Sequence, residues 1–347
     1  MSLKANLFRI NVFLKDGNKK SLFIIIREVL ELWIIKKNFP IHYFGRFLYR
    51  KDAANYKDFL DMKEYASIIL SKENNQEEFV PFLNNKLVFS NFCEKHHLPT
   101  PKVISYNLKN QFFYNGEIHR IHNKIELIEY FLMILKTTQQ EAFFVKSLIG
   151  YGGRGVHLLK LGKLKQQVEE IGDLLLSGSF IHQECIIQHP QVNEIYPNSV
   201  NTLRIETYID NVGDTHILGT FMRFGTGGKV VDNVGSGGFF VPINAETGEL
   251  IEKGTHGMIL GGGEHYKHPD TGFVFKGFKV PFFEESKELC KQLSIYIPLK
   301  LAGWDIALTP EGPVIVEGNN TPGITAGEVA YGGYVKHPLY KQMIANA

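Results

Sequence analysis

Cysteine is scarce in this sequence: its 347 residues include three cysteines and no Cys-x-x-Cys pair. Cys93, Cys185 and Cys290 are far apart and odd in number, which excludes a zinc ribbon and a dithiol redox motif. The lack of a disulfide framework is typical of a reducing compartment, so we expect a cytoplasmic protein.

Long uninterrupted apolar runs are also missing. The most apolar segment, "SLFIIIREVLELWII" from Ser21 to Ile35, is broken by Arg27, Glu28 and Glu31. It is shorter than the roughly 20 residues that a bilayer span needs, so we expect a buried helix there. The N-terminus has no apolar run followed by a small-residue cleavage site, and we therefore expect no secretory signal peptide.

Neither sign of charge dominates, because 38 Lys and Arg stand against 36 Asp and Glu. This balance excludes a general nucleic-acid coat, which would carry a large excess of cations on one face, and we expect no nucleic-acid partner. The first 60 residues are basic by comparison, with 12 Lys and Arg against 5 Asp and Glu.

The basic N-terminal stretch includes the aromatic run "KKNFPIHYFGRFLYRK" from Lys36 to Lys51. Two alternatives remain for this run. A solvated helix pair packed on the main domain is favoured, and peripheral contact with the anionic inner membrane surface is the second possibility. Residues 1–80 as a whole predict a mainly helical region that ends at the polar stretch from Ser71 to Glu78.

A glycine-rich segment, "FFVKSLIGYGGRGVHLL" at residues 143–159, matches several nucleotide-binding patterns. Gly150, Gly152 and Gly155 satisfy G-x-G-x-x-G, but both flanks alternate as strands, whereas a Rossmann turn opens a helix. A P-loop is excluded because Lys146 precedes the glycines, and the kinase motifs H-R-D and D-F-G are absent. A hairpin tip with exposed N–H groups above a strand lysine remains, and it could cover phosphates or be an ordinary surface turn.

Near the C-terminus, "GWDIALTPEGPVIVEGN" predicts a second hairpin around the turn "TPEG". Pairing about this turn places Asp305 nearly opposite Glu317, and Asn319 shares the face of Glu317. Two carboxylates flanked by apolar residues would repel each other without a cation. Their oxygens, with that of the Asn319 amide, therefore predict a Mg²⁺ site that can also bridge substrate phosphates.

At this point the sequence resembles the ATP-grasp superfamily, most closely the sugar-transfer associated ATP-grasp family. The likeness extends from about Lys86 to Thr325 and rests on the order of several segments, which are "NNKLVF", "FFVKSLIGYGGRGV", "FIHQECIIQHP", "NSVNTLRIETYI", "KVVDNVGSGGFFVPIN", "HPDTGFVFKG" and "GWDIALTPEGPVIVEGNN". The resemblance implies an α+β fold in which two lobes clasp ATP. It places a first lobe with a glycine-rich lid at 81–182 and a second lobe with the metal site at 183–347, after the helical region 1–80.

The resemblance also implies roles for individual residues. ATP would contact Lys86 and Lys146 at its α- and β-phosphates, the lid glycines Gly150, Gly152, Gly153 and Gly155, the adenine-binding segment Gln183, Glu184 and Ile186, and Asn233 near the phosphates. Arg204 and Arg223 look like the paired arginines of tubulin-tyrosine-ligase-like enzymes, and imply catalytic contacts to a γ-phosphate or an acyl phosphate. Asp305, Glu317 and Asn319 would hold Mg²⁺.

The segment "EGNNTPGIT" is similar to the D-alanine–D-alanine ligase pattern E-x-N-x-x-P-G-x-T. Two features depart from the family. A ribose-binding acid has no clear match, with Glu194 the one candidate, and a basic helical N-terminus replaces the usual α/β domain that precedes the ATP site.

The function implied is an ATP- and Mg²⁺-dependent ligase that joins a carboxylate to an amine through an acyl phosphate. Its substrates would be an amino acid and a sugar acid or surface-polysaccharide precursor. Two alternatives stay open: a kinase-like phosphotransferase on the same scaffold, which would release ADP without an amine, and a nucleotide-binding module without turnover.

Overall fold

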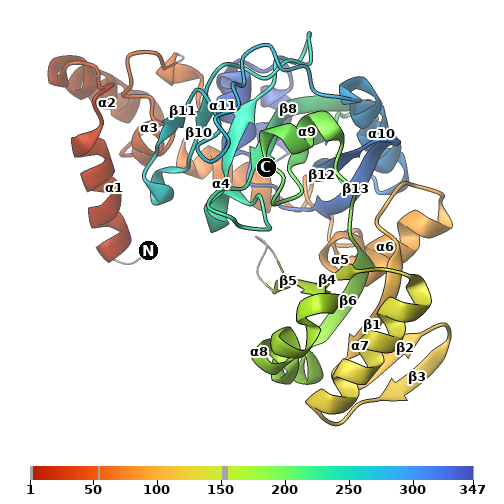
Figure 1. Cartoon of the computed structure of the whole chain (residues 1–347). Helices are drawn as coiled ribbons and strands as arrows, with labels where there is room; N and C mark the ends of the chain where they lie inside the picture. The colour runs from red at the N-terminus through yellow and green to blue at the C-terminus, as the bar shows by residue number, and fades with distance from the viewer. Residues whose placement is uncertain (1–2, 54, 151–154, 347) are drawn as a thin grey trace.

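Two antiparallel sheets organise the computed structural model, which describes residues 3–53, 55–150 and 155–346 (Figure 1). The six-stranded sheet has the order β3-β2-β1-β6-β4-β5, with β1 (Val103–Leu108), β2 (Gln111–Tyr114), β3 (Glu117–Arg120), β4 (Ala142–Ser147), β5 (Val156–Lys160) and β6 (Ser179–Glu184). The seven-stranded sheet has the order β11-β10-β9-β8-β7-β12-β13, with β7 (Thr202–Ile209), β8 (Thr215–Phe224), β9 (Phe239–Pro242), β10 (Gly254–Thr255), β11 (Glu264–His265), β12 (Leu301–Thr309) and β13 (Gly312–Asn319). The predicted α+β class is confirmed.

Helices cover these sheets and form the N-terminal region. They are α1 (Leu3–Lys15), α2 (Leu22–Lys36), α3 (Ile41–Gly45), α4 (Met62–Leu70), α5 (Val80–Asn84), α6 (Lys86–Lys95), α7 (Lys124–Thr138), α8 (Leu164–Ser177), α9 (Pro190–Ile195), α10 (Phe283–Tyr296), α11 (Thr325–Tyr331) and α12 (Tyr340–Ala345). The predicted helical character of the N-terminal region is confirmed, while the domain boundaries at residues 80 and 182 stay a prediction. No helix within the described ranges is long and apolar enough to cross a membrane.

The smaller sheet carries the predicted glycine hairpin. β4 and β5 pair antiparallel with Lys146 opposite Val156, so the loop joins two strands as the alternating flanks predicted. Phe143 and Val145 point from β4 into a core shared with α7 and α8. Because side chains alternate along a strand, Lys146 lies on the other face, away from this core.

The larger sheet is covered by α10 on one face and α11 on the other. Trp304 on β12 is fully buried, and its Nε1 donates to Thr207 Oγ1 at 2.9 Å. The β12–β13 hairpin pairs Asp305 with Glu317, as predicted, and an irregularity in register follows Asp305. The sheet interior therefore brings two carboxyl groups together from strands that are adjacent in sequence.

The expectation that the segment of α2 is a buried helix is wrong in part. It is a helix, but Phe23 and Ile34 are 77% and 78% exposed, whereas Ile25 and Leu32 are buried. Apolar residues occupy both sides of α2, and a helix that packs against the protein on one side buries only that side.

The basic aromatic run packs on the main domain, the alternative favoured from the sequence. Tyr43, Leu48 and Tyr49 are almost fully buried in it. Arg50 donates from Nη1 to Glu264 Oε1 at 3.0 Å and from Nη2 to the Gly262 carbonyl at 2.6 Å. The N-terminal helices are thereby attached to the β10–β11 edge of the larger sheet (Figure 1).

A buried acid joins β7 to the segment after α11. Glu206 is inaccessible to solvent and accepts a hydrogen bond of 2.6 Å from Tyr334 Oη. A Cβ on Gly327 would lie 2.2 Å from Glu206 Oε2, so only glycine allows this approach of α11. Burial raises the pKa of Glu206 to about 7, despite the lowering effects of Tyr334 and Arg204.

This pKa predicts that stability falls as pH rises from about 4.5 to about 7. In that window the folded protein keeps a proton that the unfolded chain has lost. Glu206→Gln should reduce the loss of unfolding free energy between these pH values by up to about 3 kcal/mol. Urea unfolding across the pH range measures it, with the exposed Glu94→Gln as control, and equal pH dependence in both variants would contradict the assignment.

Candidate functional site

A pocket of about 110 Å³ lies between the two sheets. Residues from both sheets and from α6 line it, and they include Lys86, Phe144, Lys146, Gly150, Val156, Glu184, Ile186, Thr202, Arg223, Val230, Asp232, Asn233, Asp305 and Glu317. Most of the residues predicted to bind a nucleotide are thus brought together from segments far apart in sequence. The pocket combines apolar walls near Phe144 with cations and acids near Glu317, which suits a ligand with an aromatic base and phosphates.

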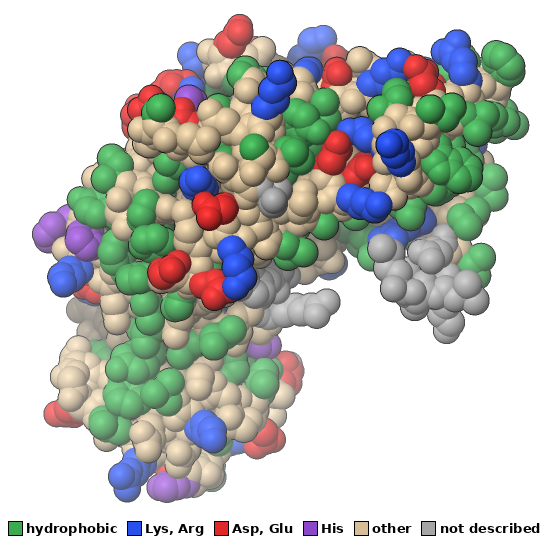
Figure 2. Space-filling model, turned by 180° about the vertical axis from the view of Figure 1, so that it is seen from behind, with side chains coloured by type: hydrophobic (Ala, Val, Ile, Leu, Met, Phe, Trp, Pro, Cys, Tyr) green, Lys and Arg blue, Asp and Glu red, His purple; other side chains and the backbone are tan. Residues whose placement is uncertain are grey.

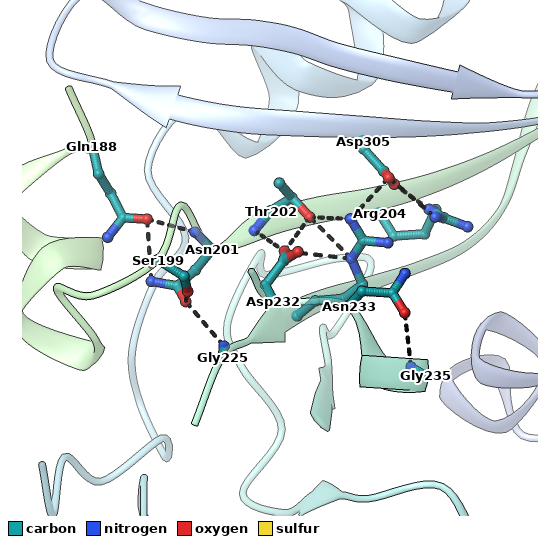
Figure 3. Close-up of polar contacts among 11 residues, drawn as sticks. Gln188, Ser199, Asn201, Thr202, Arg204, Gly225, Asp232, Asn233, Gly235 and Asp305 are labelled. Atoms are coloured by element: carbon teal, nitrogen blue, oxygen red, sulfur yellow. Dashed lines mark hydrogen bonds and ion pairs between the residues drawn. The ribbon is translucent and has the colours of Figure 1, made fainter. Parts of the chain in front are cut away.

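Asp305 on β12 is held by two arginines, Arg204 on the neighbouring strand β7 and Arg223 on β8; Figure 3 labels Asp305 and Arg204. Arg204 donates to it from Nε to Oδ1 and from Nη2 to Oδ2, the latter at 3.2 Å, and Arg223 donates from Nη2 to Oδ2 at 2.8 Å. Burial alone would raise the pKa of Asp305, but the two guanidinium groups outweigh it and hold the pKa at about 2. The carboxylate is therefore ionised at neutral pH.

The Arg223 guanidinium has further partners that the sequence analysis did not identify. Its Nε and Nη2 donate to Thr202 Oγ1 at 3.0 and 2.6 Å, and its Nε lies 3.5 Å from Asp232 Oδ2. The Thr202 hydroxyl in turn donates to Asp232 at 2.5 Å. Thr202 and Asp232, which lie side by side in Figure 3, thereby orient Arg223. The sequence did not indicate this role, because the three residues come together only in the fold.

Glu317 lies on the pocket side of the carboxylate pair, and it is partly exposed. Its pKa is raised by burial and by the neighbouring Asp305, and Lys86 opposes this at an Nζ–Oε2 distance of 3.5 Å. Lys86 Nζ also donates to the Gly150 carbonyl at 2.9 Å. Burial lowers the pKa of Lys146 to about 8, while Glu317 raises it. Two lysines and an acid with a raised pKa therefore face one pocket.

The predicted metal ligands are Asp305, Glu317 and Asn319. Among the described residues no three His, Cys, Asp or Glu side chains are arranged as a metal site, so the Asn319 amide would have to complete the set. Glu317 and Asn319 are two residues apart on β13, and buried Asn319 Nδ2 has no hydrogen-bond partner in the described chain. A cation would relieve the repulsion that raises the pKa of Glu317. The oxygen donors of these three residues are of the types that Mg²⁺ takes, so the residue types fit it. Asp305 and Glu317 line the small pocket and Asn319 lines the adjoining larger cavity, and the metal site stays a prediction.

The predicted adenine-binding segment divides between two faces of β6. Gln183 is buried on the far side, where its Nε2 donates to Ser90 Oγ and to the Pro101 carbonyl at 3.1 and 3.2 Å. Glu184 lines the pocket. The Gln183 side chain does not line the pocket, because strand alternation turns it away, and the predicted role of the segment in adenine binding stays a prediction.

Two of the four glycines predicted to form the lid lie among the described residues. Gly150 lines the pocket, Gly155 has φ +70° at the start of β5, and Gly152 and Gly153 lie outside the described residues. Asn233 also lines the pocket, and its Oδ1 caps a short 3₁₀ helix by accepting from Gly235 N at 2.8 Å. The ribose-binding candidate Glu194 is exposed on α9 and does not line this pocket.

A larger cavity of about 810 Å³ adjoins the first and shares Arg223 and Asn233 with it. Its lining combines Arg204 and Asn319 from the larger sheet with an N-terminal wall, which comprises Gly45, Arg46, Phe47, Leu48, Arg50, Asp52, Ala53 and Phe59. The N-terminal region thus forms a wall of this cavity, a role that the sequence analysis did not predict.

The fold and the site define an ATP-grasp protein. The sequence profile of the sugar-transfer associated ATP-grasp family matches residues 65–342, and the chain belongs to this family. Membership supports ATP-dependent ligase activity. A comparison with curated proteins gave no match.

Several solved structures are similar at low identity. An ADP complex of N5-carboxyaminoimidazole ribonucleotide synthetase has a TM-score of 0.42 and 11% identity, covering 73% of this chain and 48% of that one. The ATP-grasp ligase PsnB with minimal precursor, Mg and ADP gives 0.43 and 13%, covering 79% and 61%. D-alanyl-alanine synthetase A from Vibrio cholerae O1 biovar eltor gives 0.44 and 14%, covering 76% and 65%. The chain therefore spans about half to two thirds of these proteins.

The environments of the two carboxyl groups differ, so we predict that isosteric substitution lowers stability much more at Asp305 than at Glu317. Asp305→Asn leaves the buried Arg204 without its counter-ion and leaves Arg223 with Asp232 alone, and it should lower the unfolding free energy by about 3 kcal/mol or more. Glu317→Gln removes a charge that the fold disfavours and should change it by less than about 1 kcal/mol. Urea unfolding of both variants measures this, and equal losses would contradict the geometry.

Proposed function

We propose that this protein is an ATP- and Mg²⁺-dependent ligase that joins a carboxylate to an amine. The observation that carries the proposal is the Asp305–Glu317 pair at the floor of a pocket that also contains Lys86, Lys146 and Arg223. Opposite charges gathered in one partly enclosed site are suited to a phosphate–metal complex, in which acids bind the ion and cations bind the phosphates.

The proposal assigns a role to each polar side chain of the pocket discussed above. Lys86 and Lys146 bind the phosphates of ATP, and the apolar residues Phe144 and Ile186 border the place for its base. Glu317, Asn319 and Asp305 would hold Mg²⁺, which when bound supplies charge neutralisation for the β- and γ-phosphates. Arg204 and Arg223 keep Asp305 ionised and so preserve its ability to act as a ligand.

The larger cavity is the proposed place of the substrate carboxylate, since it meets the nucleotide pocket at Arg223 and Asn233. A carboxylate oxygen attacks the γ-phosphorus, and the bond to the bridging oxygen breaks with release of ADP. The amine nitrogen then attacks the acyl carbon, loses a proton, and phosphate leaves. Nη1 of Arg204 and of Arg223 makes no hydrogen bond to a described residue, so each can donate to the anion during both steps.

The family and the size of the cavity support a proposal for the substrates. We infer an amino acid as one substrate and a sugar acid or surface-polysaccharide precursor as the other, with the reaction in the cytoplasm. A cavity of about 810 Å³ is large enough for a saccharide unit together with an amino acid.

Two other functions give different products. A kinase-like phosphotransferase would release ADP with a single acceptor and no amine. A nucleotide-binding module would bind ATP without releasing ADP in any mixture of acceptors. The two guanidinium groups beside the cavity favour a ligase. An acyl phosphate has negative charge on its phosphoryl oxygens and gains charge on its carbonyl oxygen when the amine attacks, and one guanidinium group could stabilise each.

The proposal predicts ADP release in Mg²⁺ from pooled sugar acids and amino acids, dependent on both pools. Glu317→Gln should lower kcat at least about 100-fold by removing one metal ligand, while the protein stays folded. A coupled ADP assay measures the rate, and unfolding in urea serves as the control. Turnover equal to that of the native protein would exclude Glu317 from the metal site.

The assignment of the larger cavity predicts a separate effect of filling it. Ala326→Trp on α11 places a large side chain in the cavity and should raise KM for the carboxylate substrate about tenfold or more, with ATP affinity unchanged. The matched control is Ala345→Trp, at an exposed site on α12. Steady-state kinetics and ATP titration separate the two parameters, and a loss of ATP affinity instead would show that the cavity is not a separate substrate site.

A further inference from the structure

The helix α2 has two apolar faces, of which the protein covers only one. Ile25 and Leu32 pack into the N-terminal core with α3. The opposite face has large apolar side chains that are at least 49% exposed, which are Leu22, Phe23, Ile26, Leu30, Trp33 and Ile34. At 100° per residue they fall within a continuous arc of about 120°. Their regular spacing distinguishes them from scattered apolar residues of an ordinary surface.

The helix α1, which packs on the same core cluster, also has an exposed apolar side. Leu7, Ile10 and Leu14 are 58%, 54% and 63% exposed and recur at the spacing of one helix face. Both helices lie at the same end of the molecule (Figure 1), where Figure 2 shows apolar side chains gathered beside lysine and arginine. We name the exposed apolar residues of α1 and α2 the N-terminal apolar face.

Acids and cations around this face differ in their pairing. Its acids are neutralised within the protein, since Asp16 pairs with Arg50, and Glu28 with Lys20. Glu31 likewise pairs with Lys57.

The cations at the border of the face are disposed differently. Lys15, Arg27 and Lys37 are exposed, and none of them forms an ion pair with a described residue. An apolar arc bordered by cations therefore faces outward, with no net negative charge to oppose an anionic partner.

We propose that the N-terminal apolar face binds the surface of an anionic lipid bilayer. Helices with this pattern lie in the plane of the interface, with apolar and aromatic side chains among the acyl chains and cations at the headgroups. Trp33 and Phe39, whose ring centroids are 5.8 Å apart, are both exposed and are of the type that prefers this depth. A second copy of the chain fits less well, because two such faces would bring the same cations together.

This surface differs from the one that the sequence suggested. The basic run from Lys36 to Lys51 was the segment for which membrane contact was the second possibility, but most of it is buried or lines the large cavity. The membrane contact moves to the preceding helices, and it would hold the substrate cavity close to the bilayer through α3. The proposal does not depend on the ligase reaction.

Vesicle co-sedimentation of the full chain tests the proposal. Binding is expected to vesicles of phosphatidylcholine and phosphatidylglycerol in equal parts, and weaker binding to phosphatidylcholine alone or at high salt. The double variant Phe23→Glu with Trp33→Glu should lose at least about tenfold in affinity. The matched control is Val212→Glu with Ile295→Glu, which adds the same charge at sites 83% and 77% exposed elsewhere, and should bind as the native protein does.

A second double variant separates the contribution of the cations from that of the apolar side chains. Arg27→Gln with Lys37→Gln should abolish the preference for anionic vesicles and keep the weak binding to neutral ones. Urea unfolding must be equal in all variants, so that lost binding reports on the surface and not on folding. Failure of the native protein to bind anionic vesicles would overturn the proposal. A dimer that Phe23→Glu with Trp33→Glu converts to a monomer would assign the face to a second copy instead.

Discussion

The ion pair network around Asp305 is the constraint on which the larger sheet and its pocket depend. One carboxylate, buried at the centre of the sheet, accepts hydrogen bonds from Arg204 on β7 and Arg223 on β8. Each charge would be costly to bury alone; the carboxylate is stabilised by both guanidinium groups, and each guanidinium group is stabilised by the carboxylate, with Asp232 as a second acid beside Arg223. The three strands are thereby held in one register, and charged groups can line a pocket that the surrounding apolar side chains would otherwise close.

The two cavities share this network as a common border. Arg223 belongs to the lining of both, and Glu317 and Asn319, two residues apart on β13, line one cavity each. Groups proposed to bind a phosphate and groups proposed to bind an acceptor are thus close to the same arginine, Arg223. The N-terminal helices complete the second cavity from outside the larger sheet and present an apolar face to the exterior, so one region contributes to both surfaces.

Much of this arrangement was predictable where the interactions are local. The β12–β13 hairpin, the pairing of Asp305 with Glu317 and the hairpin around the glycines follow from alternation and turn residues over fewer than twenty positions. It was harder to predict which side chains of the adenine segment line the pocket, because the face on which Gln183 lies depends on the register of β6 with β1. The wall of the large cavity was not predictable, since residues near position 46 meet residues near position 326 only after folding.

The sequence by itself determined which segments form helices and strands and which acids share a hairpin, because these depend on neighbours along the chain. It also contained the apolar residues of α2, but not which of them would be covered. Tertiary structure decided that, since burial depends on the single face that packs against α3 and the residues after it. Tertiary structure likewise decided that Arg204 and Arg223 bind Asp305, because contacts between residues 82 and 101 positions apart arise only from strand order.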